Sequence, residues 1–157
     1  DFERGLLTPD QFVEACIRAW ELKLTPAEFM TTFRAWTRAL LPGAAELLEE
    51  LRPRYRLVAL SNSNEVHWHR NDVELGVPAL FETAFSSHLL GLRKPSREVY
   101  EHVLGELNVK AGEVIFFDDS PPNVEAAQAV GLRAYEVTSP AQVRSCLVDL
   151  GLLAPRS

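Results

Sequence analysis

The sequence predicts an α/β fold, in which a parallel β-sheet carries helices on both faces and a small helical subdomain precedes it. Two observations predict this fold. From Pro42 onward, short apolar runs alternate with amphipathic stretches, which is the pattern of a parallel sheet covered by helices. Before Pro42, hydrophobic residues recur only at helical spacing. We therefore expect a helical subdomain over residues 1–41 and an α/β core over residues 42–157.

Two Thr-Pro pairs, Thr8-Pro9 and Thr25-Pro26, predict where the helices of the first region begin, since threonine is a good N-cap and proline suits the first helical position. Gln11 and Glu28 complete a capping box in each helix. We expect one buried apolar stripe per helix, although one or two of its aromatic residues could instead face a substrate. The stripes are Phe12, Ala15, Cys16, Ala19 and Trp20 in the first helix, and Phe29, Phe33, Trp36 and Leu40 in the second.

The second region is expected to alternate helices with strands along its whole length. The expected strands are residues 56–60, 83–86, 113–117 and 133–137. The expected helices are residues 43–53, 64–75, 96–107, 122–130 and 140–150. The run at 113–117 is the most apolar of the strands, and Gly131 marks the end of the helix that follows it.

Composition and charge narrow the class of protein. The 157 residues are 46% hydrophobic and 24% charged, which is typical of one soluble globular domain. A formal net charge of −6 argues against nucleic acid or an anionic membrane as a partner. No apolar run is long enough to span a membrane and no basic-then-apolar leader is recognised, so we expect no segment that crosses a membrane. Cys16 and Cys146 form no close pair and fit a reducing, cytoplasmic location.

The first polar motif is Ser61-Asn62-Ser63-Asn64, between the strand at 56–60 and the helix at 64–75. In an open parallel sheet, ligands bind beyond the carboxyl ends of the strands. Backbone N–H groups and short hydroxyls at a helix start can bind a phosphate or a carboxylate. Serine and asparagine also cap helices for structural reasons, and this motif on its own favours that interpretation.

Lys94 and the pair Asp118-Asp119 are the second and third candidates. Pro95 forces Lys94 into an extended conformation, from which its ammonium can reach inward, whereas an isolated loop lysine is usually solvated. Asp118 and Asp119 end the most apolar strand and repel one another unless a cation or a lysine compensates. Carboxylate oxygens suit Mg²⁺, so metal binding is favoured over a role in capping the next helix.

The order of these motifs resembles that of the haloacid dehalogenase (HAD) superfamily. Leu60-Ser61-Asn62-Ser63 resembles its second motif, Lys94-Pro95 its third and Phe117-Asp118-Asp119-Ser120 its fourth. The resemblance covers about Thr8 to Leu150 and implies a HAD-like, Rossmann-like core with the helical hairpin as a cap. Dehalogenases usually carry a Ser-Ser-Asn type of sequence where this chain has Asp118-Asp119. The resemblance therefore favours hydrolysis of a small phosphorylated substrate over carbon–halogen cleavage.

The resemblance also implies a role for each candidate residue. Ser61 would hydrogen-bond the transferred phosphoryl group, with Asn62 close by. Lys94 would neutralise the charge of the phosphate and the nucleophile. Asp118 and Asp119 would bind or orient Mg²⁺ and its waters, so that Lys94 and Asp119 are the candidate catalytic residues.

The sequence departs from the superfamily at its N-terminal end. Members begin with a strand that ends in Asp-x-Asp, whose first aspartate is the nucleophile. Asp1-Phe2-Glu3 imitates this spacing, but no apolar run precedes it. In the family this first strand is central, between those expected at 56–60 and 113–117. We therefore expect either an active phosphatase whose first strand is not in this sequence, or a truncated, inactive domain that binds a ligand or self-associates as a homo-oligomer.

The sequence disfavours two alternatives, a histidine metal pair and a receiver domain. His67-Trp68-His69 could suggest a metal pair, but positions two apart do not share a helix face, so a surface or cap contact is favoured. Receiver domains of two-component signalling also combine acids, a lysine and Mg²⁺. In receivers, however, the acid pair precedes the lysine, whereas here Lys94 precedes Asp118.

Overall fold

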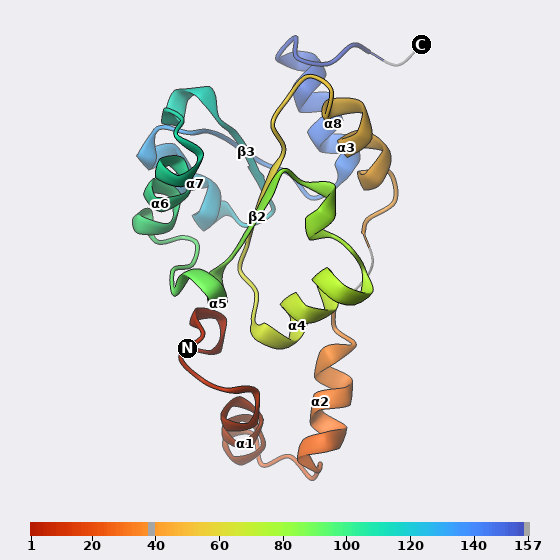
Figure 1. The fold of residues 1–157 in the computed structure, drawn as a ribbon, viewed down its shortest axis with the longest axis vertical. Helices are drawn as coiled ribbons and strands as arrows, with labels where there is room; N and C mark the ends of the chain where they lie inside the picture. Colours follow the sequence, from red (N-terminus) through yellow and green to blue (C-terminus); the bar gives the residue numbers. More distant parts are fainter. Residues whose placement is uncertain (38–39, 156–157) are drawn as a thin grey trace. The chain divides into compact units, whose positions relative to one another are not determined.

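The computed structural model describes residues 1–37 and 40–155. They form two compact units, Asp1–Ala39 with Arg56–Arg93 and Leu40–Tyr55 with Lys94–Ser157. Each unit combines helices with a parallel sheet of two strands (Figure 1). The predicted α/β class with parallel strands is therefore confirmed. The predicted division into residues 1–41 and 42–157 stays a prediction.

The sheet of the first unit pairs β1 (Val58–Ser61) with β2 (Thr83–Ser86). Ser61 lies opposite Ser86, so the carboxyl ends of the two strands are level. β1 leads into α4 (Glu65–His69), which continues as a π-helix over Arg70–Glu74. A 3₁₀ turn at Pro78–Leu80 precedes β2, and α5 (Ser87–Leu90) follows it.

The helical hairpin of the first unit consists of α1 (Pro9–Ala19) and α2 (Pro26–Arg34). Both predicted capping boxes are present. In the first, Gln11 N donates to Thr8 Oγ1 over 3.3 Å and Thr8 N donates to Gln11 Oε1 over 2.9 Å. Thr25 and Glu28 make the same pair of bonds in the second. Local sequence therefore fixes both helix starts.

The buried face of the hairpin differs from the predicted stripes. Trp20 is 60% exposed, Trp36 61% and Leu40 38%, so their predicted burial is wrong; Ala15 and Ala19 are exposed as well. The predicted burial of Cys16, Phe29 and Phe33 is confirmed, and Phe2 and Val13 complete this core.

Phe2 explains the shift. It lies in a 3₁₀ turn, Phe2–Arg4, and its ring stacks on that of Phe12 with 4.3 Å between centroids. The helix face that includes Val13 is thereby turned inward, while the face of Ala15 and Ala19 is left to solvent. The same turn shows that Asp1-Phe2-Glu3 is not a strand, in agreement with the sequence interpretation.

The sheet of the second unit pairs β3 (Ile115–Asp118) with β4 (Arg133–Glu136), and Asp118 lies opposite Glu136. Helix α7 (Pro121–Val130) packs against both strands and against α6 (Arg97–Leu107). The buried residues of these two helices are Val99, Tyr100, Val103, Val124 and Ala127. Gly131, at φ 102°, ends α7 as predicted.

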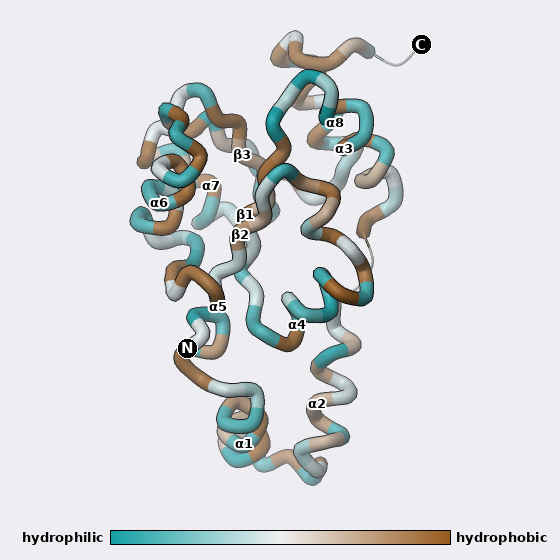
Figure 2. Tube along the Cα trace, viewed as in Figure 1, coloured by the Kyte–Doolittle hydropathy of each residue, from teal (hydrophilic) through white to brown (hydrophobic). Residues whose placement is uncertain are grey.

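The remaining helices of the second unit, α3 (Ala44–Leu51) and α8 (Pro140–Asp149), contact one another. Arg144 of α8 forms an ion pair with Glu50, and Tyr55 donates a hydrogen bond to the carbonyl of Leu152 over 2.7 Å. In Figure 2 the helices alternate between hydrophilic and hydrophobic segments, as amphipathic helices do. Among the described residues, none of the helices is long and apolar enough to cross a membrane.

Candidate functional site

Lys94 and Asp118 form a buried ion pair in the second unit. The Nζ atom of Lys94 lies 2.6 Å from Oδ2 of Asp118, and each residue is only 9% exposed. Lys94 follows the loop after α5 and stands just before α6, joined to Pro95 by a cis peptide bond. Its ammonium also lies 5.6 Å from the centroid of the Phe116 ring. The lysine therefore points inward, as the extended conformation before proline suggested.

Asp118 is held at the end of β3 by two further hydrogen bonds. Its Oδ1 atom accepts hydrogen bonds from Ser120 N over 2.9 Å and from Asn123 Nδ2 over 2.8 Å. Burial alone would raise the pKa of the Asp118 carboxyl. The hydrogen bonds from Lys94, Asn123 and Ser120, together with the charge of Lys94, outweigh burial and hold this pKa below its usual value. Asp118 is therefore an ionised carboxylate paired with a cation.

Asn123 is a second partner of Asp118 to which the sequence analysis gave no role. It lies in the first turn of α7, and its carbonyl accepts a hydrogen bond from the Tyr100 hydroxyl over 2.8 Å. Burial, with a smaller effect of the Asp118 charge, raises the pKa of Tyr100 to about 12. The signal that could have found Asn123 is an amide one helical turn after an acidic strand end, where it can reach back to the carboxylate.

Asp119 has a very different environment from its neighbour. It is exposed, and within the described part of the chain its carboxylate makes no hydrogen bond or ion pair. The two adjacent acids thus separate into a buried carboxylate that fixes Lys94 and an exposed carboxylate with both oxygens available.

The donor set at the end of β3 fits Mg²⁺ in its chemistry. In residues 1–37 and 40–155, no group of three or more His, Cys, Asp and Glu side chains is arranged to hold a metal ion. Mg²⁺, however, commonly binds to one or two carboxylates and keeps several waters or substrate oxygens. Asp119 offers two oxygens, and Oδ2 of Asp118 keeps a second acceptor position beside its bond to Lys94.

The Ser61–Asn64 segment lies in the first unit, at the carboxyl end of β1. Ser63 and Asn64 are buried, 6% exposed each, and both have structural partners. Ser63 N donates to Ser87 Oγ over 3.0 Å, and Ser87 Oγ donates to the Ser63 carbonyl over 2.9 Å. Asn64 Oδ1 accepts from His67 N over 3.0 Å and caps α4. The capping interpretation thus holds for Asn64, while Ser61 and Asn62, both half-buried, stay candidates.

The structure therefore brings together two of the five candidate residues, Lys94 and Asp118, and places Asp119 directly beside them. Ser61 and Asn62 belong to the other unit. His67 contacts the helical hairpin, since its Nε2 atom lies 2.7 Å from the carbonyl oxygen of Phe33. This is the cap contact that the sequence favoured over a metal pair.

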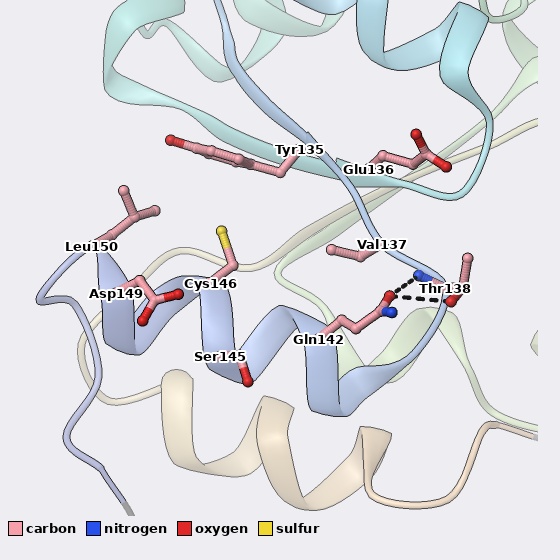
Figure 3. A pocket seen from close by; sticks show the side chains of 9 residues that line it. All are labelled: Tyr135, Glu136, Val137, Thr138, Gln142, Ser145, Cys146, Asp149 and Leu150. Atoms are coloured by element: carbon pink, nitrogen blue, oxygen red, sulfur yellow. Dashed lines mark hydrogen bonds between the residues drawn. The ribbon is translucent and has the colours of Figure 1, made fainter.

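A cavity of about 550 Å³ lies elsewhere in the second unit, between β4 and α8 (Figure 3). Tyr135 and Val137 line it from the strand side, and the sulfur of Cys146 points into it from α8. Cys16 and Cys146 are both free thiols, as expected. None of the candidate site residues lines this cavity, so it is separate from the chemistry at the end of β3.

Comparison with known proteins decides the family. The family model for haloacid dehalogenase-like hydrolases matches residues 8–131. The chain belongs to this family. A sesquiterpene phosphatase from Aspergillus oryzae is 36% identical over 87% of this chain and 70% of its own length. A phosphatase from Mycobacterium tuberculosis is 32% identical over 71% of this chain and 53% of its own length.

A solved structure of a HAD family enzyme from Bacteroides thetaiotaomicron, in complex with magnesium and inorganic phosphate, shares the fold. It is 24% identical, with a TM-score of 0.78 over 88% of this chain and 73% of that chain. The HAD-like fold is thus shown. The motifs around Ser61 and Asp118 lie within the matched range of the HAD-like family model.

Proposed function

We propose that this HAD-like hydrolase takes part in Mg²⁺-dependent hydrolysis of phosphate monoesters, and that its phosphate and metal site is the carboxyl end of β3. The observation that carries the proposal is the buried Lys94–Asp118 pair at 2.6 Å with the exposed carboxylate of Asp119 beside it. The two relatives described above, both named as phosphatases, support the class of substrate.

Lys94 supplies a fixed positive charge. Its ammonium is almost buried, and the ion pair with Asp118 holds it in place. A preorganised cation in a site with little water stabilises the negative charge that develops on a transferred phosphoryl group far better than a solvated lysine would. Asn123 and Ser120 hold Asp118 and so set the position of the lysine indirectly.

Asp119, with the remaining acceptor position of Asp118, would hold Mg²⁺. The bound ion supplies a Lewis acid that polarises a phosphoryl oxygen. Asp119 can serve this role without first breaking another contact, because its carboxylate is exposed. Ser61 and Asn62, at the carboxyl end of β1 in the first unit, are proposed as phosphate ligands because they resemble the second motif of the family.

The reaction also needs a carboxylate nucleophile. We assign this role to no described residue. Asp1 precedes a 3₁₀ turn, and Asp118 is engaged by Lys94 and Asn123. The first test is therefore binding of inorganic phosphate, which needs no nucleophile.

The experiment is calorimetric titration of the chain with inorganic phosphate, with and without MgCl₂. We expect binding that requires Mg²⁺, and at least about tenfold weaker binding in Asp119→Asn, a loss of about 1.4 kcal/mol. Asp149→Asn, another exposed aspartate of the second unit, is the matched control and should bind as the parent does. Equal affinity with and without Mg²⁺, or unchanged affinity in Asp119→Asn, would overturn the proposed site.

A second candidate function is a binding module without turnover. The observation that favours it is that the described strands form two separate sheets of only two strands each, which are marginal on their own and have edges able to accept another strand. Turnover of p-nitrophenyl phosphate separates the candidates. Mg²⁺-dependent release supports hydrolysis; Mg²⁺-dependent phosphate binding with no release, together with a dimer in light scattering, supports the module.

A further inference from the structure

His67 makes hydrogen bonds to two different parts of the first unit. Its Nδ1 atom lies 3.1 Å from Nδ2 of Asn64, and its Nε2 atom lies 2.7 Å from the carbonyl oxygen of Phe33 in α2. The imidazole also stacks on the Phe33 ring, with 4.3 Å between centroids and 27° between planes. One side chain on α4 therefore joins the Ser61–Asn64 segment to the helical hairpin.

The hydrogen-bond network fixes the tautomer of His67. Asn64 Oδ1 accepts from His67 N, so the amide group of Asn64 turns its Nδ2 toward the imidazole. Nδ1 of His67 must then accept, which leaves the proton on Nε2 to be donated to the Phe33 carbonyl. Both bonds exist together only in this neutral form.

The Nδ1 atom of His67 faces the Ser61–Asn64 segment, which contains the proposed phosphate ligands. Asn64 is 6% exposed and directly follows Ser61, Asn62 and Ser63. Ser63 is tied to Ser87 by two hydrogen bonds, and Asn64 is tied to His67 by two. The backbone of the segment is thus held at two consecutive residues, and His67 provides one of these anchors.

The Nε2 atom of His67 faces the end of α2. Phe33 is 5% exposed and belongs to the aromatic core of the hairpin. Arg70, one helical turn after His67, donates to the Arg34 carbonyl over 2.6 Å, and Arg34 forms an ion pair with Glu74. The segment after β1 thereby donates to the last two carbonyls of α2, and that of Phe33 also accepts a hydrogen bond from Trp36 N over 3.1 Å.

We infer that His67 is a positioning residue that couples the order of the helical hairpin to the order of the Ser61–Asn64 segment. Phosphate bound at Ser61 then orders the end of α2, and an ordered hairpin strengthens phosphate binding by the same factor, because such coupling is reciprocal. The phosphate part of this inference rests on the proposed function. The coupling itself can be measured without any ligand.

The test is amide hydrogen exchange of the full chain, followed by NMR, in three variants of His67. His67→Phe keeps a ring to stack on Phe33 and loses both hydrogen bonds. His67→Asn keeps an acceptor near the position of Nδ1, and His67→Gln keeps a donor near that of Nε2. His69→Gln, on the exposed side of α4, is the matched control.

Without ligand, we expect His67→Phe to exchange about fivefold faster at Ser63–His67 and at the end of α2, since each lost hydrogen bond is worth roughly 1 kcal/mol and about 1.4 kcal/mol is a factor of ten. His67→Asn should exchange faster mainly at α2, and His67→Gln mainly at Ser63–His67. His69→Gln should match the parent. Equal exchange in His67→Phe and the parent at both places would overturn the inference, and if His67→Phe fails to fold, the same comparison is made with His67→Asn and His67→Gln.

Inorganic phosphate with MgCl₂ is then added. In the parent we expect slower exchange at both Ser61–Asn64 and the end of α2; in His67→Phe the effect at α2 should vanish. A parent that slows at Ser61–Asn64 but not at α2 would overturn the inference. If phosphate changes nothing in the parent while the ligand-free differences are seen, the proposed function fails and the coupling by His67 is supported.

Discussion

The carboxyl ends of the two sheets differ in the charge of their side chains. In the second unit, the end of β3 is charged: a buried ion pair between Lys94 and Asp118 with Asp119 exposed beside it. In the first unit, the end of β1 is neutral: Ser63 and Asn64 are held by hydrogen bonds to Ser87 and His67. Removing one charge from a buried pair leaves the other uncompensated, whereas removing one neutral hydrogen bond costs far less. The two ends should therefore respond very differently to mutation.

The largest effect is expected for Lys94→Met, which keeps the length of the side chain and removes its charge. Asp118 would be left as an unpaired buried carboxylate, and the free energy of unfolding should fall by about 3–5 kcal/mol. Urea unfolding at pH 7 measures this. Lys23→Met, at an exposed lysine, should change stability by less than about 0.5 kcal/mol. A loss below about 1 kcal/mol in Lys94→Met would show that the pair is solvated.

The next effect is the response to acid. The pKa of Asp118 is lower in the folded chain than in the unfolded one. The stability that this carboxylate contributes is therefore fully present above the ordinary aspartate pKa of about 4, and it is lost as the pH falls through the folded pKa. Unfolding curves at pH 6 and pH 3 should show a smaller loss of stability in Asp118→Asn than in the parent. An equal loss in both proteins would contradict the ionised pair.

At the neutral end, Asn64→Ala removes the cap of α4 and the amide partner of His67. We expect a loss of about 1 kcal/mol at pH 7, typical of a helix N-cap. Thermal unfolding of the parent and of Asn62→Ala, two residues before the cap, gives the comparison. If Asn64→Ala cost as much as Lys94→Met, the contrast between the two ends would be wrong.

The smallest effect is expected for Tyr100→Phe, which removes the hydrogen bond to the Asn123 carbonyl and costs about 1 kcal/mol or less at pH 7. The pKa of Tyr100 is raised to about 12 in the folded chain. Because the unfolded phenol ionises near pH 10, the parent should lose stability between pH 10 and 12. Tyr100→Phe should lose less over that range in urea titrations; parallel curves would argue against a buried phenol.

Features that depend on local sequence were predictable. The Thr-Pro pairs at Thr8 and Thr25 gave both helix starts, and Gly131 gave a helix end, because capping is decided within four or five residues. The buried face of α1 was not predictable from its own periodicity. Phe2 comes from outside the helix and stacks on Phe12, and Val13 is buried beside them. Trp20 follows the last residue of the helix and is exposed.

The candidate site was also predictable only in part. That Asp118 needs a compensating cation followed from the repulsion of two adjacent carboxylates, and Lys94 is that cation. Which of the two acids is buried did not follow, since it depends on Asn123 reaching back from α7 to one of them. The pairing of Ser63 with Ser87 was also beyond the sequence, because it joins the ends of two strands that only the sheet register brings level.

The most direct test of the central claim, that the end of β3 binds a divalent ion, is an NMR titration with Mn²⁺ as a paramagnetic substitute for Mg²⁺, since both prefer carboxylate and water oxygens. The account predicts selective broadening of the amide signals of Asp118, Asp119 and Ser120 in the parent, reversed by excess Mg²⁺ and absent in Asp119→Asn. Broadening that is centred elsewhere, or that persists in Asp119→Asn, would contradict it.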